Sequence, residues 1–392
     1  MRYYSLNQSY RPGKLACLFG AALFLCATAS LSRPETEWPV YRGDMQLRGV
    51  AQGELSSQLE LKWRYKTEGP IYSSPVLSDG RVYFGSDDKL LRCLNANDGT
   101  LIWETATSSS LAAPPLIADG SVFIGSAEGV MHAFDAATGE LQWRHTAQDK
   151  IQGSANFVPD QGADKPACLI FGSYDMRLYG LDPRTGTQRW SYETDNFING
   201  SPAVIDRRAV FGGCDAFLHV VDVDTGTSVA QIEIGDYIAA SAALDSGHAF
   251  LGHYGNEVVC IDLETGKLQW RYQDRPYAFF SSPAVNADSV VIGCRDKRVH
   301  CIDRATGEAR WQFATRGRVD SSTVICGDKV VACSEDGRVY VIALENGRSL
   351  WSYEIGEAIS GSPAIVDGRV YIGSEGGAMY CFGPATEGPQ EP

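Results

Sequence analysis

The sequence has no excess of positive charge, and it contains none of the short motifs that mark common catalytic or metal sites. It holds 34 Lys and Arg against 48 Asp and Glu, a formal net charge of −14. This balance excludes nucleic acid as a partner, because binding a polyphosphate requires a basic surface. The chain has no C-x-x-C or H-E-x-x-H spacing, no G-x-S-x-G elbow and no phosphate-binding glycine loop. We therefore predict no catalytic residue and no metal site.

Helical periodicity is absent too, and short alternating apolar runs take its place. In residues 281–311, SSPAVNADSVVIGCRDKRVHCIDRATGEARW, runs such as VVIG and RVHCI are separated by turn residues. Alternation with a period of two predicts strands joined by tight turns. We interpret this stretch as four short antiparallel strands.

The same unit recurs along nearly the whole chain. A four-stranded sheet repeated every roughly 40 residues cannot bury both faces alone, but it can stack on its neighbours around an axis as a propeller blade. We predict an all-β fold, an eight-bladed β-propeller of four-stranded antiparallel blades. The eight copies span residues 73–103, 113–143, 153–190, 200–230, 240–270, 281–311, 321–351 and, truncated, 361–382.

The two ends of the repeated region complete each other. Residues 59–66 match a fourth strand with no three strands before it, and the last copy has three strands but lacks the fourth. We predict that the N-terminal strand pairs with the last blade and closes the ring. The expected organisation is a signal peptide (1–29), an N-terminal cap or linker (30–58), the propeller (59–382) and a disordered tail (383–392) rich in Gly, Pro and Glu.

Residues 1–29 indicate export. Three basic residues precede the uncharged apolar run 15–29, which ends in the small-residue pattern Ala27-Thr28-Ala29. Two alternatives are an uncleaved membrane anchor and a lipoprotein signal with Cys26 as the modified residue, against which Leu25 argues. We expect a periplasmic or cell-surface protein, a monomer that meets a membrane only through a possible N-terminal anchor.

A tryptophan occupies one position of the fourth strand in seven of the eight blades. We expect these indoles to be structural wedges between adjacent blades, each costing roughly 3 to 5 kcal/mol when truncated. Ala230 is the exception, so the fourth blade should pack less tightly against its neighbour. The seven positions are Trp63, Trp103, Trp143, Trp190, Trp270, Trp311 and Trp351.

Repeated carboxylates, thiols and imidazoles are explained by the repeat. The aspartates of the D-x-x-T-G turns should bond local backbone N–H groups, which favours a turn role over an acid/base or calcium site. An EF-hand-like spacing in residues 221–233 is rejected, because Thr227 stands where that loop needs Gly. Nine cysteines follow residue 29, and those at one third-strand position should be small buried residues. The turn aspartates are Asp135, Asp182, Asp222, Asp262 and Asp303, the third-strand cysteines are Cys93, Cys260, Cys301 and Cys381, and three histidines share the neighbouring position at His132, His219 and His300.

One position in the copies is irregular within a regular frame. The residue three before the Pro of the S-P pair varies freely, while the residue before it is almost always a large apolar one. Such a position escapes the packing constraint and should face the axial channel or its mouth, where mixed side chains suit a small ligand or a peptide. The eight residues are Tyr72, Ala112, Gln152, Asn199, Ala239, Phe280, Asp320 and Ser360, and the candidate contacts are Tyr72 and Phe280 as anchors with Gln152, Asn199 and Asp320 as polar partners.

The repeat resembles a known family. The pattern S-P-A-V, then V-Y-I-G-S-x-D-G-x-L-Y-x-L-D-x-x-T-G-x-x-x-W, is similar to the pyrroloquinoline-quinone (PQQ) type of propeller repeat of the quinoprotein alcohol dehydrogenase-like superfamily, and 361–381, GSPAIVDGRVYIGSEGGAMYC, matches it closely. The opening W-P-x-Y-R-G at residues 38–43 is similar to the start of many exported bacterial members. The architecture most resembles the BamB branch, outer-membrane assembly lipoproteins that lack the cofactor.

The resemblance implies two readings of function. Quinoprotein dehydrogenases bind PQQ and calcium at the axis with an Asp base, Glu and Asn ligands, a stacking Trp and a disulfide of adjacent cysteines. This chain has no Cys-Cys pair, no long insertion and no Trp outside the repeat position except Trp38, so no catalytic residue is carried over. We predict an exported, non-catalytic scaffold without a cofactor, whose partner is an envelope protein or a small ligand. The alternatives are a PQQ-dependent oxidoreductase of alcohols or sugars, with PQQ and Ca²⁺, and a carbohydrate-binding propeller.

Overall fold

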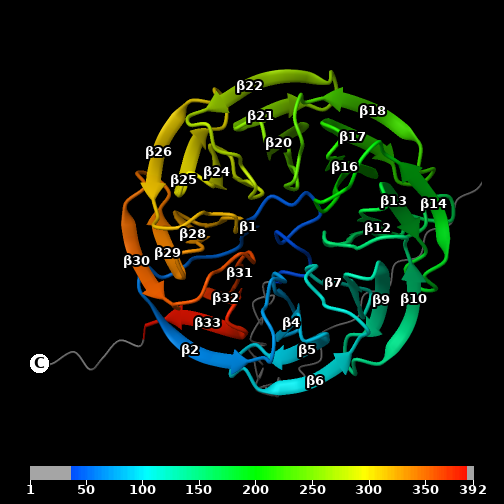
Figure 1. Cartoon of the computed structure of the whole chain (residues 1–392), viewed down its shortest axis with the longest axis horizontal. Coiled ribbons are helices and arrows are strands. Elements are labelled where there is room, and N and C mark those ends of the chain that lie inside the picture. Colours follow the sequence, from blue (N-terminus) through cyan, green and yellow to red (C-terminus); the bar gives the residue numbers. More distant parts are fainter. Residues whose placement is uncertain (1–36, 386–392) are drawn as a thin grey trace, which may run out of the picture. The chain divides into compact units, whose positions relative to one another are not determined.

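Eight antiparallel sheets stand around a central axis, one for each copy of the repeat (Figure 1). The computed structural model describes residues 37–385, so the predicted signal peptide lies outside the described residues. These residues contain no helix, and hence none that could span a membrane. The predicted all-β, eight-bladed propeller is confirmed.

The strands of the first four blades are β3 (Val76–Ser78), β4 (Arg81–Gly85), β5 (Leu90–Asn95) and β6 (Leu101–Ala106); β7 (Leu116–Ala118), β8 (Ser121–Gly125), β9 (Val130–Asp135) and β10 (Leu141–Thr146); β11 (Asn156–Val158), β12 (Cys168–Gly172), β13 (Arg177–Leu181) and β14 (Gln188–Glu193); β15 (Ala203–Ile205), β16 (Arg208–Gly212), β17 (Phe217–Asp222) and β18 (Ser228–Glu233). Those of the last four are β19 (Ala243–Asp245), β20 (His248–Gly252), β21 (Glu257–Asp262) and β22 (Lys267–Gln273); β23 (Ala284–Val285), β24 (Ser289–Cys294), β25 (Arg298–Asp303) and β26 (Ala309–Ala314); β27 (Val324–Cys326), β28 (Lys329–Cys333), β29 (Arg338–Ala343) and β30 (Ser349–Glu354); β31 (Ala364–Val366), β32 (Arg369–Ser374), β33 (Ala378–Pro384) and β2 (Leu59–Lys66). A further strand, β1 (Val50–Ala51), joins the seventh sheet in parallel with β27.

The order of strands within a blade follows from burial. The middle strands are sandwiched between neighbouring blades, so β8 and β12 are buried throughout, whereas the outer strand β6 leaves alternate residues exposed. Strands buried on both faces need continuous apolar sequence, and an outer strand needs alternation. Both patterns are present in each copy.

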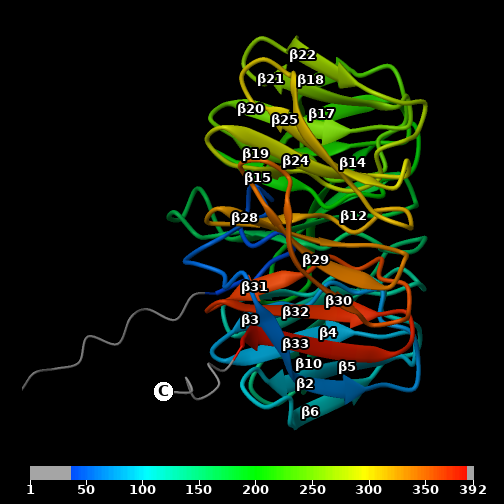
Figure 2. The same cartoon turned by 90° about the vertical axis from the view of Figure 1, so that its left-hand side faces the viewer.

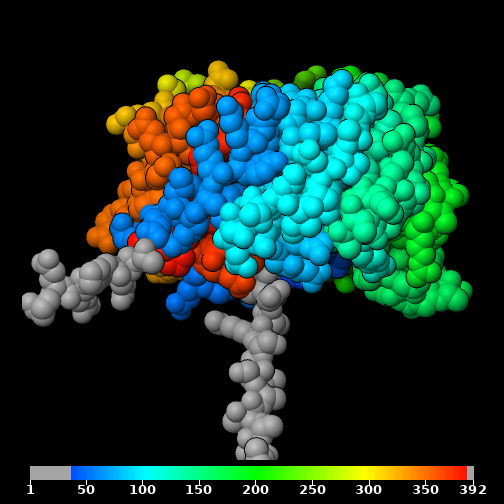
Figure 3. Space-filling model, turned by 90° about the horizontal axis from the view of Figure 1, so that it is seen from below, coloured from blue at the N-terminus to red at the C-terminus, as the bar shows by residue number. Residues whose placement is uncertain are grey.

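The ring closes as predicted, through the chain's own two ends. Strand β2 pairs antiparallel with β33, in a register from Leu59 opposite Pro384 to Lys66 opposite Ala378. Figure 3 shows the blue N-terminal residues in the seam between the orange-red last blades and the cyan first blade. The ladder carries β33 to Pro384, so the ordered chain runs two residues past the expected end at 382, because β2 supplies partners there.

The indoles dock on the next blade. In six of the seven, Nε1 donates to a backbone carbonyl of the following blade, as Trp143 does to Pro183 at 2.9 Å. The ring lies over the turn glycine there: a Cβ built on Gly186 would come within 2.4 Å of Trp143. The seventh, Trp351, packs on Phe382 with ring centroids 5.6 Å apart.

The exceptional blade is looser, as its alanine predicts. A Cβ built on Gly266, the turn glycine facing Ala230, would meet nothing closer than Ile232, at 3.6 Å. A cavity of about 50 Å³ lies here, lined by residues that include Ile232 and Gly266. The missing indole is therefore only partly replaced.

The N-terminal segment 38–51 lies across one end of the axis (Figures 1 and 2). Its backbone meets the innermost strands of successive blades: Trp38 exchanges two hydrogen bonds with Leu77, and the carbonyl of Gly49 accepts from Ile325 at 3.0 Å. The bonds between these two ends of the segment pair Pro39 with Ile117, Met45 with Val204, Gln46 with Leu244 and Arg48 with Val285. The segment therefore ties the blades together around the axis.

The repeated carboxylates and thiols are structural, as expected. Asp222 Oδ1 accepts the N–H groups of Asp224 and Thr225 and the Thr225 hydroxyl, and Asp262 binds its own turn in the same way. All nine cysteines among the described residues are unpaired, and all but Cys214 are buried.

Candidate functional site

The free end of the axis holds two adjoining hollows. The inner one, of about 180 Å³, is lined by all eight residues of the irregular repeat position. The outer one, the mouth, has about 730 Å³ and shares seven of those eight residues. Of the candidate contacts, Tyr72, Gln152, Asn199 and Phe280 line both hollows, and Asp320 lines the inner one.

A belt of serines surrounds the inner hollow. Seven of the eight copies have a serine at the position of the first residue of the S-P pair, although Ala155, Ala242 and Thr323 replace the proline in three of them. In six of the seven the serine hydroxyl oxygen accepts the backbone N–H of the corresponding serine in the preceding blade, at 2.8–3.1 Å. Pro114 interrupts the belt, since it has neither hydroxyl nor N–H. Tyr41 of the N-terminal segment also lines this hollow, and its hydroxyl lies 2.9 Å from Ser322 Oγ. The belt serines are Ser74, Ser154, Ser201, Ser241, Ser282, Ser322 and Ser362.

Aromatic side chains gather at the mouth on blades 3 to 6. Tyr174 and Phe197 stack with centroids 5.0 Å apart, and Tyr254 lies 4.5 Å from Phe280. Phe197, Tyr237 and Tyr254 are 39%, 52% and 42% exposed. Exposed aromatic residues grouped on one surface are typical of binding sites.

Each of two mouth aromatics carries a cation on its ring face. Lys150 Nζ lies 3.9 Å from the centroid of Tyr174, and Arg295 Cζ lies 3.4 Å from that of Phe280. Arg295 also pairs with Asp320 at 2.7 Å, and the hydrogen bond to that carboxylate raises the pKa of Arg295. The negative charge of Asp320 is therefore balanced by Arg295 within the wall of the hollow.

Acidic groups lie on the opposite side, on blades 8 and 1. The pKa of the Tyr72 hydroxyl is raised by burial and by the charges of Glu375 and Asp87. The pKa of Asp87 is itself raised, by burial and by Asp88. The mouth is thus polarised, with Lys150 and Arg295 held on aromatic rings on one side and the carboxylates of Asp87 and Glu375 acting on Tyr72 on the other.

The lining residues do not fit PQQ with calcium. Calcium takes six to eight oxygen ligands, several of them carboxylates. The inner hollow has one carboxylate, Asp320, which Arg295 already holds, and no tryptophan lines either hollow. The amide nitrogen of Asn199 donates to Cys214 Sγ at 3.2 Å, which leaves its carbonyl oxygen as a single neutral ligand for a cation.

Sequence reasoning named one ring of residues and missed the rim above it. One rim position lies directly before the large apolar residue that precedes the ring position, and it holds Lys150, Phe197 and Tyr237. The other follows the second strand of a blade, and it holds Tyr174, Tyr254 and Arg295. Comparing the copies at these two further positions would have revealed the clustering of aromatics in blades 3 to 6. At the ring position itself, Tyr72 and Phe280 are the only aromatic residues.

The fold and this axial site define an eight-bladed propeller of the PQQ-repeat type. The chain belongs to the family described as outer membrane protein assembly factor BamB, whose model matches residues 46–211 and 215–391. No curated protein matches the sequence.

Solved structures share the fold at low sequence identity. BamB from Moraxella catarrhalis is 19% identical with a TM-score of 0.70, over 84% of this chain and 99% of that one. A quinohemoprotein alcohol dehydrogenase from Comamonas testosteroni is 14% identical with a TM-score of 0.75, over 91% and 82%. A europium-containing methanol dehydrogenase is 12% identical with a TM-score of 0.76, over 90% and 99%. At these identities the likeness establishes the fold alone.

Proposed function

We propose that the protein is a non-catalytic scaffold of the bacterial cell envelope, which binds an extended segment of a partner protein at the axial mouth. The observation that supports this proposal is the uneven charge of the mouth. Aromatic rings with Lys150 and Arg295 on their faces lie on one side, and acidic groups lie near Tyr72 on the other. An extended peptide with an aromatic or aliphatic residue and, several residues away, a Lys or Arg matches that arrangement.

The envelope assignment rests on two supports. The first is the signal-like segment 1–29 of the sequence. The second is membership of a family described as an outer membrane protein assembly factor. Attachment through an N-terminal anchor is compatible with both.

Chemistry at the mouth is disfavoured by the state of its side chains. A general base must be free to accept a proton at the reacting atom, yet Asp320 of the inner hollow is held by a bidentate Arg295. Asp87 is then the one remaining carboxylate among the residues that line the two hollows, without a second carboxylate beside it in that lining to act as its acid or metal-ligand partner. Sugar binding is disfavoured because the ring faces of Tyr174 and Phe280 are already covered by Lys150 and Arg295. Protein contacts need no such free face.

Site-specific photocrosslinking in intact cells tests the proposal. A photoreactive phenylalanine analogue at position 280 or 72 should give one discrete crosslinked partner, whereas the same analogue at Leu101, an exposed residue of the outer strand β6, should not. The captured segment should contain an aromatic or aliphatic residue near position 280 and a basic residue near position 72. Equal crosslinking from Leu101 would contradict a mouth-specific site.

Reconstitution with PQQ and Ca²⁺ separates the scaffold from the oxidoreductase. We expect neither a retained quinone absorbance after gel filtration nor dye-linked oxidation of alcohols or sugars. Stoichiometric PQQ retention with turnover would replace the scaffold with an enzyme. A glycan array supplies the third comparison: a hit that Phe280→Ala abolishes would instead favour carbohydrate binding.

A further inference from the structure

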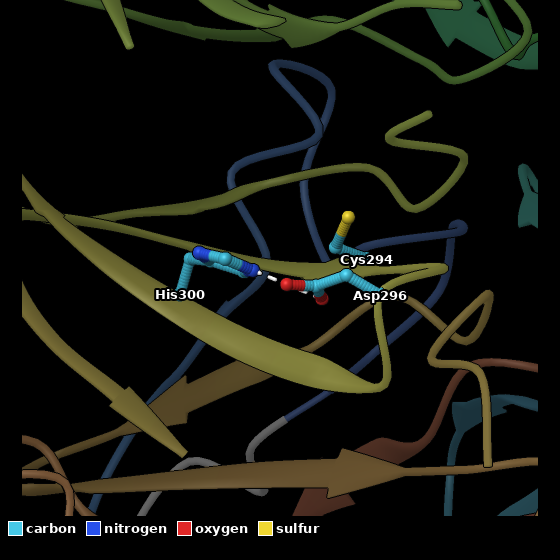
Figure 4. Close-up of side chains that lie close together, drawn as sticks. All are labelled: Cys294, Asp296 and His300. Carbon is cyan, nitrogen blue, oxygen red and sulfur yellow. Dashed lines mark hydrogen bonds and ion pairs between the residues drawn. The ribbon is translucent and has the colours of Figure 1, made fainter. Parts of the chain in front are cut away.

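Three metal-ligating side chains meet in the β24–β25 hairpin of blade 6. Cys294, Asp296 and His300 are all buried, and their ligand atoms lie within 4.8 Å of one another (Figure 4). His300 Nε2 is 3.2 Å from Asp296 Oδ1, and His300 Nδ1 is 2.9 Å from the Tyr272 hydroxyl. Motif spacing gave no sign of this cluster, since C-x-D-x₃-H is not a familiar ligand pattern.

Blade 4 contains the same arrangement without the thiol. There Tyr192, His219 and Asp215 form an equivalent chain, with distances of 3.1 and 2.9 Å. The second oxygen of Asp215 accepts the backbone N–H of Phe217 at 3.2 Å, and Gly213 stands where blade 6 has its cysteine. In blade 4 the aspartate is therefore fully satisfied by protein groups.

Asp296 differs from its counterparts in other blades. Asp175 and Asp336 each accept the N–H of the residue two positions on. In blade 6 the hairpin is tighter, because β24 extends to Cys294 and pairs it with Arg298, and Asp296 Oδ2 is buried with no hydrogen-bond partner. The nearest cationic atom, Arg298 Nε, is 4.0 Å away. A buried carboxylate oxygen left in this state is costly and favours a bound cation.

We propose that Cys294 Sγ, Asp296 Oδ2 and His300 Nε2 bind one divalent cation of the zinc type. Thiolate, imidazole and carboxylate together are a zinc-type ligand set, and three protein ligands leave a fourth position for water or another ligand. In the metal-free structure His300 Nε2–H donates to Asp296 Oδ1. Binding therefore requires the imidazole proton to lie on Nδ1, where the Tyr272 hydroxyl oxygen accepts it, so that Nε2 presents its lone pair to the ion, as in zinc sites whose histidines are oriented by a second hydrogen bond. Binding converts the Cys294 thiol to thiolate and releases that proton to solvent.

Serine is the matched replacement for Cys294. In blade 1 the same position is Ser86, whose hydroxyl donates to the carbonyls of Gly69 and Pro70 at 3.1 Å. Cys294 Sγ makes the corresponding contacts with Tyr277 and Ala278, at 3.5 and 3.6 Å. Cys294→Ser therefore keeps the packing role while removing the thiolate.

Cobalt titration of the chelator-treated protein tests the proposal. Co²⁺ should bind at one equivalent and give a thiolate-to-cobalt charge-transfer band with tetrahedral d–d bands, and Zn²⁺ should displace it. Cys294→Ser should abolish the charge-transfer band, and Asp296→Asn should weaken Zn²⁺ binding at least about tenfold. His219→Gln, in the blade that lacks the thiol, should leave the spectrum unchanged. Absence of the band in the native protein, or its survival in Cys294→Ser, would overturn the site.

Discussion

The docking of an indole on a turn glycine yields a quantitative prediction with an internal control. Gly186 and Gly266 occupy the same repeat position with nearly the same backbone, φ 70° and 67°. Alanine at either position pays the left-handed penalty of roughly 1–2 kcal/mol. At Gly186 the new Cβ would also lie 2.4 Å from Trp143, whereas at Gly266 the nearest atom is 3.6 Å away.

The difference in stability between the two variants isolates the contribution of the contact between the indole and the turn glycine. Overpacking against a rigid ring costs about 1–3 kcal/mol, so Gly186→Ala should destabilise by about 2–5 kcal/mol and Gly266→Ala by about 1–2 kcal/mol. At roughly 2 °C per kcal/mol for a chain of this size, the melting temperatures should fall by about 4–10 °C and 2–4 °C.

Thermal unfolding at one fixed scan rate, followed by circular dichroism, measures both. A third variant, Gly226→Ala, should resemble Gly186→Ala, since its Cβ would lie 2.6 Å from Trp190. If Gly266→Ala proves as harmful as the other two, backbone strain alone explains the glycines, and the indoles are not wedges of the kind described.

Three further predictions concern other parts of the ring. In folded chains without residues 1–29, maleimide should label one thiol per molecule, that of Cys214. Labelling should become faster as pH rises, because thiolate is the reactive form and burial raises the pKa of that thiol. Mass spectrometry of Cys214→Ser should show no label. Burial acts to raise the pKa of Asp88, but its hydrogen bond to Arg92 outweighs this and lowers it, so the pair's stabilisation is present above about pH 4 and is lost as pH falls through the folded-state pKa; acid titration should therefore destabilise the native protein more than Asp88→Asn. Deleting residues 59–66 removes the partner of β33 and exposes a strand edge, so size-exclusion chromatography should show aggregates where the intact chain elutes as a monomer.

The periodic features of this protein could be predicted from its sequence, because every copy of the repeat supplies an independent observation of the same packing. Blade number, ring closure and the place of the indoles follow from positions that recur. The irregular ring around the axis was found by the same comparison, but from variation instead of recurrence. A residue that varies between copies, while its neighbours in the sequence stay the same in kind, is free of the packing that fixes those neighbours. Tyr72 and Phe280 were located in this way, and both line the mouth.

Features that occur once could not be predicted, because nothing in the sequence repeats them. The path of residues 38–51 depends on backbone bonds to six blades, which leave no side-chain pattern. The extra pairing of Cys294 with Arg298 tightens the blade 6 hairpin, as that of Ser374 with Ala378 does in blade 8, but only blade 6 has an aspartate in that turn, and its Oδ2 is left without a hydrogen bond. Such differences arise from the register of a single turn.

Departures from the repeat therefore separate into two kinds, according to whether the surrounding structure compensates for them. Where Ala230 replaces an indole, Ile232 fills part of the space. This change is partly absorbed by packing. At Asp296, Oδ1 is bound by His300, but Oδ2 stays buried without a hydrogen bond, with Arg298 Nε 4.0 Å away, beside a thiol and an imidazole. Unsatisfied buried atoms also occur at Ser374 and His132, where no ligand cluster is found among the described residues. The combination of an unsatisfied buried carboxylate oxygen with a thiol and an imidazole within 4.8 Å therefore gives the blade 6 hairpin its claim to a bound ion.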